Sequence, residues 1–331
     1  MAILIDPPAW PAHGTLWSHL VSDASYEELH DFAARLGVPR RSFDLDHYDV
    51  PSRLFERAVA LGARPVSGKD VVHGLRASGL RVRTAERAAL RPVRRRQFLV
   101  AEWGGLGTRL GIGIGSGIRS GSGIRNGIRS DSDAPGSAWR ELGDELITRW
   151  NEPHRNYHDE RHLEDVLLSL DHLAVRGERL SKETLLAAWF HDAVYRGTAS
   201  DEADSAALAA AALGRAGLAP GLRDTVGALI EATAPGRAVR DPDPALAQLL
   251  DADLGIFAAP QRRYDEYASA VRGEYAHVPD QEFALRRSEI LGAYLARPSI
   301  YLTATARELW ERAARANVER ELAALAAVAR G

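Results

Sequence analysis

A Gly- and Ser-rich stretch at residues 104–138 constrains the fold of this chain more than any other feature. It reads GGLGTRLGIGIGSGIRSGSGIRNGIRSDSDAPGSA, with Gly-Ile-Arg repeated at Gly117, Gly123 and Gly127. A segment of this composition cannot bury enough apolar surface to offset the entropy that is lost on ordering. We therefore predict a flexible linker at residues 101–138, with a domain on each side of it. Because the isoleucines are regularly spaced, transient docking of the linker on one of the domains remains an alternative.

The composition fits two globular domains and excludes several classes of protein. The 331 residues suffice for two domains of ordinary size, and a net charge of only -3 gives no global reason to bind nucleic acid or anionic membranes. Cysteine is absent, which excludes disulfides and cysteine nucleophiles and fits a reducing cytoplasm. The N-terminus lacks a basic signal-peptide region, and no stretch approaches the ~20 apolar residues of a membrane span. We expect a cytoplasmic protein without a membrane partner.

Arginine is far more common than lysine, with two lysines among the 42 basic residues. We interpret this bias as the codon usage of a GC-rich bacterial genome, because the arginines are spread through both halves. Residues 76–96 are the exception, with eight arginines and one glutamate. They form either a basic patch for nucleic acid or a solvated connecting segment, and we favour the connecting segment.

Residues 1–100 are predicted to form a small α/β domain with a basic tail. An apolar strand is expected at residues 2–5. Ser25 is a suitable N-cap for a helix at residues 26–36, and Gly37 is a typical residue after a helix end. Two further helices are expected, at residues 51–61 and 69–77.

Four polar residues mark a possible site in this domain. Asp6 follows the first strand, at the strand end where sites of α/β proteins gather, and His19, Asp46 and His47 come later. A metal or nucleotide site and a rigid packed loop with capping histidines both remain open. The segments ILIDPPAWPAHGTLWSHLVSD and FDLDHYDVP resemble a small bacterial family of unknown function, which implies no activity.

Residues 139–331 are predicted to form an all-α helical bundle. Apolar residues recur at three- and four-residue spacing, and short Gly/Pro breaks separate the periodic segments. No alternating strand pattern interrupts them.

The first informative motif of this half is WNEPHRNYHDERHLEDVLLSLDHL, from Trp150. Pro153 suits a helix start, and His154, His158 and His162 would then rise along one side of the helix. His162 lies at the edge of the apolar stripe. A lone histidine there is commonly a core residue, but three in register favour a site.

The second motif is SKETLLAAWFHDAVY, in which His191 and Asp192 close a strongly apolar helix that Ser181 caps. The chain contains two other His-Asp pairs, at residues 30–31 and 158–159. Only the pair at His191 follows a helix that must be buried, so this pair is the candidate.

The third motif is PALAQLLDADLGIF, in which Asp253 falls on the apolar helix face. Asp251 projects roughly 200° away from it. A carboxylate among leucines is costly unless it is paired or coordinates a cation. We therefore predict that Asp253 is a metal ligand and that Asp251 is a structural residue or one that supports the ligands, with Asp251 as the alternative ligand.

These motifs together supply two imidazoles and two carboxylates. Such a set suits Mn, Fe, Co, Ni, Zn or Mg, and it leaves positions for a water and a phosphate oxygen. A metal can lower the pKa of that water and polarise the phosphorus centre. The set is therefore sufficient for hydrolysis of a phosphoester.

The same motifs resemble the HD superfamily of metal-dependent phosphohydrolases. RNYHDERHLEDVL, AAWFHDAVY, SDEADSAALAA, DADLGIF and VRGEYAHVP are similar to a bacterial HD subgroup, over about residues 139–325. The resemblance implies an HD-type fold. It also implies four metal ligands, which are His162, His191, Asp192 and Asp253.

The resemblance further assigns residues around the metal. It places Arg155 and Tyr157 at the mouth of the site, and the planar fork of Arg155 can clamp a phosphate. His158 and Asp192 would be the catalytic residues, with His158 acting as a proton donor or as a ligand of a second metal. Glu202 falls in a recurrent motif and is a candidate substrate contact.

We therefore expect a metal-dependent phosphohydrolase that cleaves a phosphate ester or anhydride of a small substrate, with a nucleotide favoured. The alternative is a nucleotide-sensing or nucleic-acid-associated regulatory protein whose pocket binds without turnover. The sequence leaves a homo-oligomer open.

Overall fold

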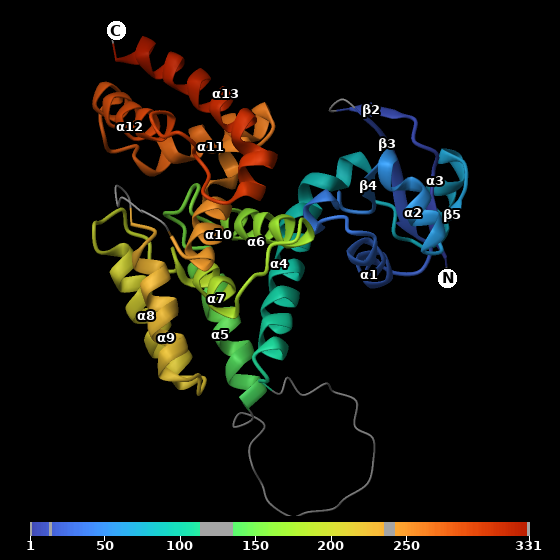
Figure 1. Cartoon of the computed structure of the whole chain (residues 1–331), viewed down its shortest axis with the longest axis horizontal. Coiled ribbons are helices and arrows are strands. Elements are labelled where there is room, and N and C mark those ends of the chain that lie inside the picture. Colours follow the sequence, from blue (N-terminus) through green and yellow to red (C-terminus); the bar gives the residue numbers. More distant parts are fainter. Residues whose placement is uncertain (1, 13–14, 113–134, 235–241, 330–331) are drawn as a thin grey trace, which may run out of the picture. The chain divides into compact units, whose positions relative to one another are not determined.

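The computed structural model describes residues 2–12, 15–112, 135–234 and 242–329 (Figure 1). The chain folds as two compact units. The N-terminal unit comprises Met1–Arg95 with Asp171–Glu178, and the helical unit comprises Arg96–Leu170 with Arg179–Gly331.

A mixed five-stranded sheet forms the centre of the N-terminal unit. Its strands lie in the order β2-β3-β1-β5, and β4 pairs with β3. β1 is parallel to β5 and antiparallel to β3, which in turn is antiparallel to β2 and β4. The strands are β1 (Ile3–Ile5), β2 (Trp10–Ala12), β3 (Thr15–Ser22), β4 (Tyr48–Pro51) and β5 (Arg64–Pro65).

Helices contribute two separate apolar clusters against this sheet. Leu29 and Phe32 of α1 (Tyr26–Leu36) share one cluster with Ile5 of β1. Val71 of α3 (Gly68–Ala77) shares the other cluster with Leu4. Because Leu4 and Ile5 are successive strand residues, they point to opposite sheet faces. The α/β prediction is confirmed, and the sheet carries helices on both faces.

Local sequence signals account for the helix ends. The hydroxyl of Ser25 accepts a hydrogen bond from the amide of Glu28, and Gly37 has φ 82°. The helix predicted at residues 26–36 is therefore confirmed at both ends. The helix predicted at residues 51–61 is shorter, because Pro51 ends β4 and a 3-10 turn precedes α2 (Phe55–Ala60).

The helix α4 (Thr84–Arg109) corrects the predicted linker. Residues 101–109 are helical, and Trp103 and Leu106 are buried. At the other end, α5 begins at Pro135 and runs to Arg149. The predicted linker at residues 101–138 is therefore wrong at both ends, and its middle, residues 113–134, lies outside the described residues.

Two tryptophans join α4 to α5 within the helical unit. The rings of Trp103 and Trp139 stack with centroids 4.0 Å apart. Each indole N–H donates to the backbone carbonyl of the other residue, at 2.7 and 3.0 Å. Gly143 allows this approach, since a Cβ atom there would lie 2.3 Å from Cδ1 of Trp103. We call this arrangement the tryptophan clasp.

All described secondary structure of the helical unit is helical, as the sequence predicts. Figure 1 shows α8 and α9 side by side, and α12 runs next to α13. A continuous apolar core includes Trp150, Trp189 and Phe190. The further helices are α6 (Glu160–Val175), α7 (Lys182–Phe190), α8 (Asp201–Arg215), α9 (Pro220–Glu231), α10 (Pro244–Asp253), the 3-10 helix η4 (Leu254–Ala258), α11 (Gln261–Glu274), α12 (Asp280–Leu295) and α13 (Ala304–Val328).

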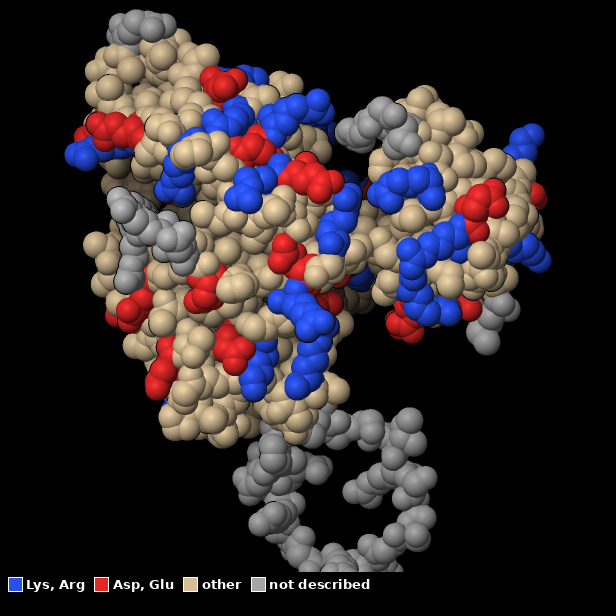
Figure 2. All heavy atoms as spheres, viewed as in Figure 1, with Lys and Arg blue, Asp and Glu red and all other residues tan. Residues whose placement is uncertain are grey.

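Charge is mixed over the surface. Figure 2 shows Lys and Arg interleaved with Asp and Glu on the visible face. Within residues 76–96, Arg81 and Arg87 form ion pairs with Asp46 and Asp44, and the guanidinium of Arg94 lies 4.3 Å from the ring centroid of Tyr26. These three arginines of the predicted basic segment therefore already have partners within the N-terminal unit. Among the described residues, none of the helices has the length and apolar character needed to span a membrane.

Candidate metal centre

The first histidine motif folds differently from its predicted helix. α6 begins at Glu160, and residues 150–159 form turns and bends instead. Asp159 ends this loop, since its Oδ1 accepts hydrogen bonds from the amides of Arg161 and His162. The prediction of a helix from Pro153 is wrong. Of the three histidines predicted to share one helix face, only His162 lies on a helix.

His162 and His191 lie close together in the helical unit. His191 follows the end of α7, which Ser181 caps as predicted. A hydrogen bond of 3.0 Å joins Nδ1 of His191 to the carbonyl of Ala188, so its Nε2 is left to face the site. This Nε2 lies 3.2 Å from Nε2 of His162, and both side chains are almost completely buried.

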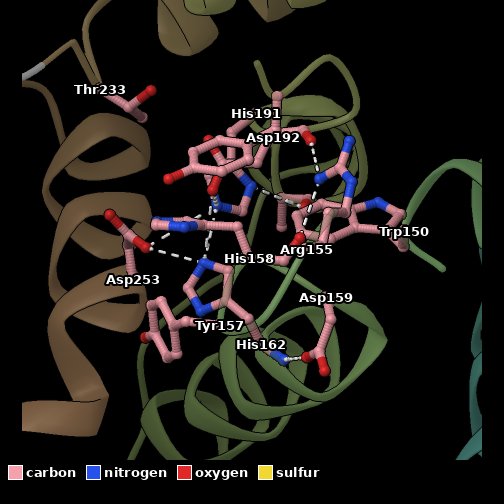
Figure 3. A network of polar contacts seen from close by, with 12 residues as sticks. Trp150, Arg155, Tyr157, His158, Asp159, His162, His191, Asp192, Thr233 and Asp253 are labelled. Carbon is pink, nitrogen blue, oxygen red and sulfur yellow. Dashed lines mark hydrogen bonds and ion pairs between the residues drawn. The ribbon is translucent and has the colours of Figure 1, made fainter. Parts of the chain in front are cut away.

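Two carboxylates complete the cluster. Oδ1 of Asp253, at the end of α10, lies 3.1 Å from Nε2 of His162 and 3.7 Å from Nε2 of His191. Oδ2 of Asp192 lies 3.6 and 3.3 Å from the same two atoms. In Figure 3 the four side chains point toward one another. We call His162, His191, Asp192 and Asp253 the helical-unit cluster.

The spacing of these donor atoms suits a single cation. Bonds of ~2.1 Å place neighbouring ligand atoms about 3.0–3.4 Å apart, in octahedral or tetrahedral geometry. The donor atoms of His162, His191 and Asp253 all lie within 4.8 Å of one another, and this group could hold a metal ion. The chain therefore presents a His/Asp donor set near metal-binding distances.

The electrostatics of the cluster are those of a site that needs positive charge. Burial opposes protonation of His162, but Asp192 and Asp253 outweigh it and raise its pKa to about 10. Burial likewise disfavours ionisation of both carboxylates, yet the neighbouring imidazoles hold the pKa values of Asp192 and Asp253 below their usual range. The two carboxylates therefore favour positive charge at the imidazoles. A divalent ion held by the cluster would supply such charge.

Asp251 and Asp253 have separate roles, but their burial is the reverse of the prediction. Asp251 is only 1% exposed, and its oxygens accept from the amides of Leu302 and Thr303 at 2.6 and 2.7 Å. Burial raises the pKa of Asp251 to about 6, although these amides favour its charged form. The side chain of Asp253 is 27% exposed. The burial argument for Asp253 was therefore wrong, and Asp251 instead anchors the end of α10 to the start of α13.

Glu274, at the end of α11, organises the loop and was missed by the sequence argument. Its Oε1 accepts from three successive amides, those of residues 156–158, at 2.8–3.0 Å. Its Oε2 lies 2.7 Å from Nδ1 of His158 and 2.8 Å from the hydroxyl of Tyr195. Burial opposes ionisation, but these contacts hold the pKa of Glu274 at about 2. The motif VRGEYAHVP contains Glu274, which is the one sequence signal that pointed to it.

His158 lies next to the helical-unit cluster without being among its closest donors. Its ring centroid is 5.6 Å from that of His162, and it stacks on Tyr195 at 4.2 Å. Glu274 thus engages one ring nitrogen of His158, Nδ1, and not the other, Nε2.

Arg155 does not have the role that the sequence predicted. Its guanidinium donates to the carbonyls of His158, Asp192 and Ala193 at 2.8–3.2 Å, and its side chain is fully buried. The guanidinium that was predicted to clamp a phosphate is therefore occupied by backbone carbonyls. Arg155 instead fixes the chain on both sides of the cluster, as its place beside Trp150 and Asp192 in Figure 3 illustrates.

The two other predicted substrate contacts differ in access. Tyr157 is buried, its ring lies 4.8 Å from that of His162, and burial raises its pKa well above the ordinary value. It packs against His162 rather than lining an open mouth. Glu202, on α8, is half-buried, and burial together with the charge of Asp192 raises its pKa. A hollow of about 370 Å³ is lined by residues that include His154, Ala193 and Tyr195, but by none of the four residues of the helical-unit cluster.

The structure also brings together the four residues predicted for an N-terminal site. Asp6 and Asp46 are almost completely buried. Asp6 lies 2.8 Å from Nδ1 of His19, and Asp46 lies 2.7 Å from Nδ1 of His47. The two imidazole rings are 5.1 Å apart. Asp49, which lies close to Asp46 and His47 in the sequence, completes a group of three that could hold a metal ion, with His19 and His47.

Comparison with known proteins gives one match. Residues 3–78 match a family model described as a protein of unknown function (DUF4031). No curated protein and no solved structure matches the chain. The match covers the sheet and the helices α1 to α3 of the N-terminal unit. The resemblance of that half to a family of unknown function is therefore confirmed, while the helical unit is known from its motifs and geometry alone.

Proposed function

We propose that residues 139–331 form a metal-dependent phosphohydrolase of HD type, acting on a phosphate ester or anhydride of a small molecule such as a nucleotide. The observation that carries the proposal is the convergence of four donors from three separate segments. Two buried Nε2 atoms lie 3.2 Å apart, with Asp192 and Asp253 beside both of them. The motifs that resemble the HD superfamily supply all four donors.

The residues present fit a divalent ion held by the helical-unit cluster. Imidazole and carboxylate donors suit Mn, Fe, Co, Ni, Zn or Mg. When bound, such an ion lowers the pKa of a water molecule and polarises a phosphoryl oxygen. Asp192 and Asp253 remain 17% and 27% exposed, so water and substrate can reach this side of the cluster.

The surrounding residues support the same chemistry. Glu274 orients His158, whose Nε2 is placed to donate a proton to a leaving group. Arg155 fixes the backbone at Asp192 and Ala193 rather than contacting substrate. The positive charge that a phosphate requires must therefore come from the bound ion and from residues other than Arg155.

The test is turnover by the full chain with added Mn²⁺, Co²⁺, Ni²⁺ or Zn²⁺ on a panel of nucleotides and phosphate monoesters. We expect metal-dependent release of phosphate, abolished by Asp192→Ala. Asp224→Ala, an exposed aspartate on α9, is the matched control and should retain activity. Metal binding without turnover of any panel member would contradict the hydrolase and favour a nucleotide-sensing pocket.

A further inference from the structure

The N-terminal unit carries a second His/Asp cluster that is independent of the proposed hydrolase. His19 lies on β3 directly opposite Asp49 on β4, and cross-strand partners have Cβ atoms about 4.5–5.5 Å apart. His47 lies immediately before β4, and its Nε2 is 3.6 Å from Oδ1 of Asp49. One donor atom each from His19, His47 and Asp49 lies within 4.8 Å of the others.

A buried carboxylate holds each imidazole of this cluster. Oδ2 of Asp6 lies 2.8 Å from Nδ1 of His19, while its Oδ1 accepts from the amide of His19 at 2.5 Å. Oδ1 of Asp46 lies 2.7 Å from Nδ1 of His47, and its Oδ2 accepts from the amide of Val82 at 2.8 Å. Both carboxylates are therefore fixed in place by backbone.

This arrangement is the one that ligating histidines commonly show. A carboxylate on one ring nitrogen fixes the tautomer and orientation of the imidazole and raises its basicity, which leaves the other nitrogen for a metal. Its occurrence on two neighbouring imidazoles requires two buried aspartates, which would be costly to bury without a partner. A packed loop needs neither the pairing of both rings nor their convergence on Asp49.

We propose that His19, His47 and Asp49 bind a divalent first-row transition-metal ion, with Asp6 and Asp46 as positioning residues. Two imidazoles and one carboxylate are a mixed nitrogen and oxygen set that suits Zn²⁺, Fe²⁺, Mn²⁺, Co²⁺ or Ni²⁺. The side chains of His19 and Asp49 are 29% and 47% exposed. The site opens to solvent, and three protein ligands leave positions for water or a small ligand.

The test uses the full chain with Asp253→Asn, which disables the helical-unit cluster, and measures Zn²⁺ by equilibrium dialysis with metal analysis. We expect one Zn²⁺ per chain in this background. Adding His47→Gln or Asp49→Asn should weaken that binding at least about 100-fold. His73→Gln, an exposed histidine on α3 of the same unit, is the matched control and should leave it unchanged.

The positioning residues have their own readout. Asp6→Asn should weaken Zn²⁺ binding about 10- to 100-fold, while the metal-free variant retains the wild-type circular dichroism spectrum. A purely structural Asp6 would instead change folding without a separate change in zinc affinity. No zinc in the folded Asp253→Asn background, or unchanged zinc after both His47→Gln and Asp49→Asn, would overturn the proposal. Neither result depends on whether the helical unit hydrolyses a phosphate.

Discussion

The two units each gather histidines and aspartates, but they differ in which side of the imidazoles carries two carboxylates. In the helical-unit cluster, Asp192 and Asp253 lie on the Nε2 side, where a cation would bind. In the N-terminal unit, Asp6 and Asp46 lie on the Nδ1 side and orient the rings. The first arrangement offers two carboxylates to a cation, whereas the second offers one, Asp49, and uses two further carboxylates to orient its imidazoles.

Burial separates the two clusters further. His162 and His191 are 1% and 2% exposed inside a helical core, while His19 and His47 are 29% and 14% exposed on a sheet. A deep cluster depends on the packing around it. A cluster on a sheet depends mainly on strand register and on the carboxylates behind it. The same residue types can therefore make a site of either kind, and only their surroundings distinguish the two.

The largest expected effect separates the two aspartates of α10. Asp253→Asn should weaken metal binding by the helical-unit cluster at least about 100-fold, because it removes a charged ligand. Asp251→Asn should change metal affinity less than tenfold but lower the free energy of unfolding by about 1–3 kcal/mol, because its amide cannot accept from both Leu302 and Thr303 as the carboxylate does. Calorimetric titration with Mn²⁺ and urea unfolding measure the two effects. The opposite pattern would make Asp251 the ligand.

Glu274 tests whether a carboxylate on Nδ1 also matters in the helical unit. Glu274→Gln should lower the turnover of the proposed hydrolase about 10- to 100-fold, because His158 loses the partner that orients it. Metal affinity should change little, since Glu274 is not a ligand. Steady-state kinetics and metal titration on the same variant separate these effects, with Glu282→Gln on the exposed first turn of α12 as the control. Unchanged turnover would remove His158 from the mechanism.

Close packing around Trp103 should contribute measurably to the stability of the helical unit. Gly143→Ala introduces a Cβ atom 2.3 Å from Trp103 and should lower the free energy of unfolding by about 1–3 kcal/mol. Gly105→Ala, on α4 close to the same tryptophan, meets no atom within 4 Å and should stabilise the helix by up to about 1 kcal/mol. Urea unfolding followed by tryptophan fluorescence measures both. Equal stability of the two variants would show that Trp103 can move aside.

A last test concerns acid stability of the N-terminal unit. Burial, with nearby Arg40 and Arg94, lowers the pKa of His30 to about 3, below its usual 6.5. The unfolded chain therefore binds more protons between pH 6.5 and 3, so His30 makes folding less favourable as the pH falls through this window. His30→Gln should reduce the slope of stability against pH there, by at most about 1.4 kcal/mol per pH unit. Parallel slopes for the variant and wild type in urea unfolding would contradict a neutral buried His30.

The sequence predicted local structure well where the signals were local. Ser25 and Gly37 bound a helix whose ends agree with the prediction, and Ser181 caps α7 as expected. Nearby residues satisfy the amides and carbonyls at such ends, so a short window of sequence contains the needed information.

The predictions failed where distant residues decide. Pro153 is compatible with a helix start, but Glu274 binds three amides of the loop after it from more than a hundred residues away. The helical-face argument put Asp253 in the core, but contacts from Leu302 and Thr303 place Asp251 there. The apolar stripe of α4, by contrast, is a local signal that the linker prediction missed. The arginines before this stripe and the glycines within and after it hid the helical spacing of Phe98, Trp103 and Leu106.

The tryptophan clasp has a consequence for how this chain can change in length. It holds residues 103 and 139 together through two hydrogen bonds and a ring stack, so the join between α4 and α5 does not rely on what connects residue 112 to residue 135. For a flexible connection, as the sequence predicts, doubling the length adds only about 0.6 kcal/mol of closure entropy. Gain or loss of Gly-Ile-Arg units by replication slippage would then leave both helices in register. We therefore expect an insertion within the repeat to leave the ring stack and its two hydrogen bonds intact.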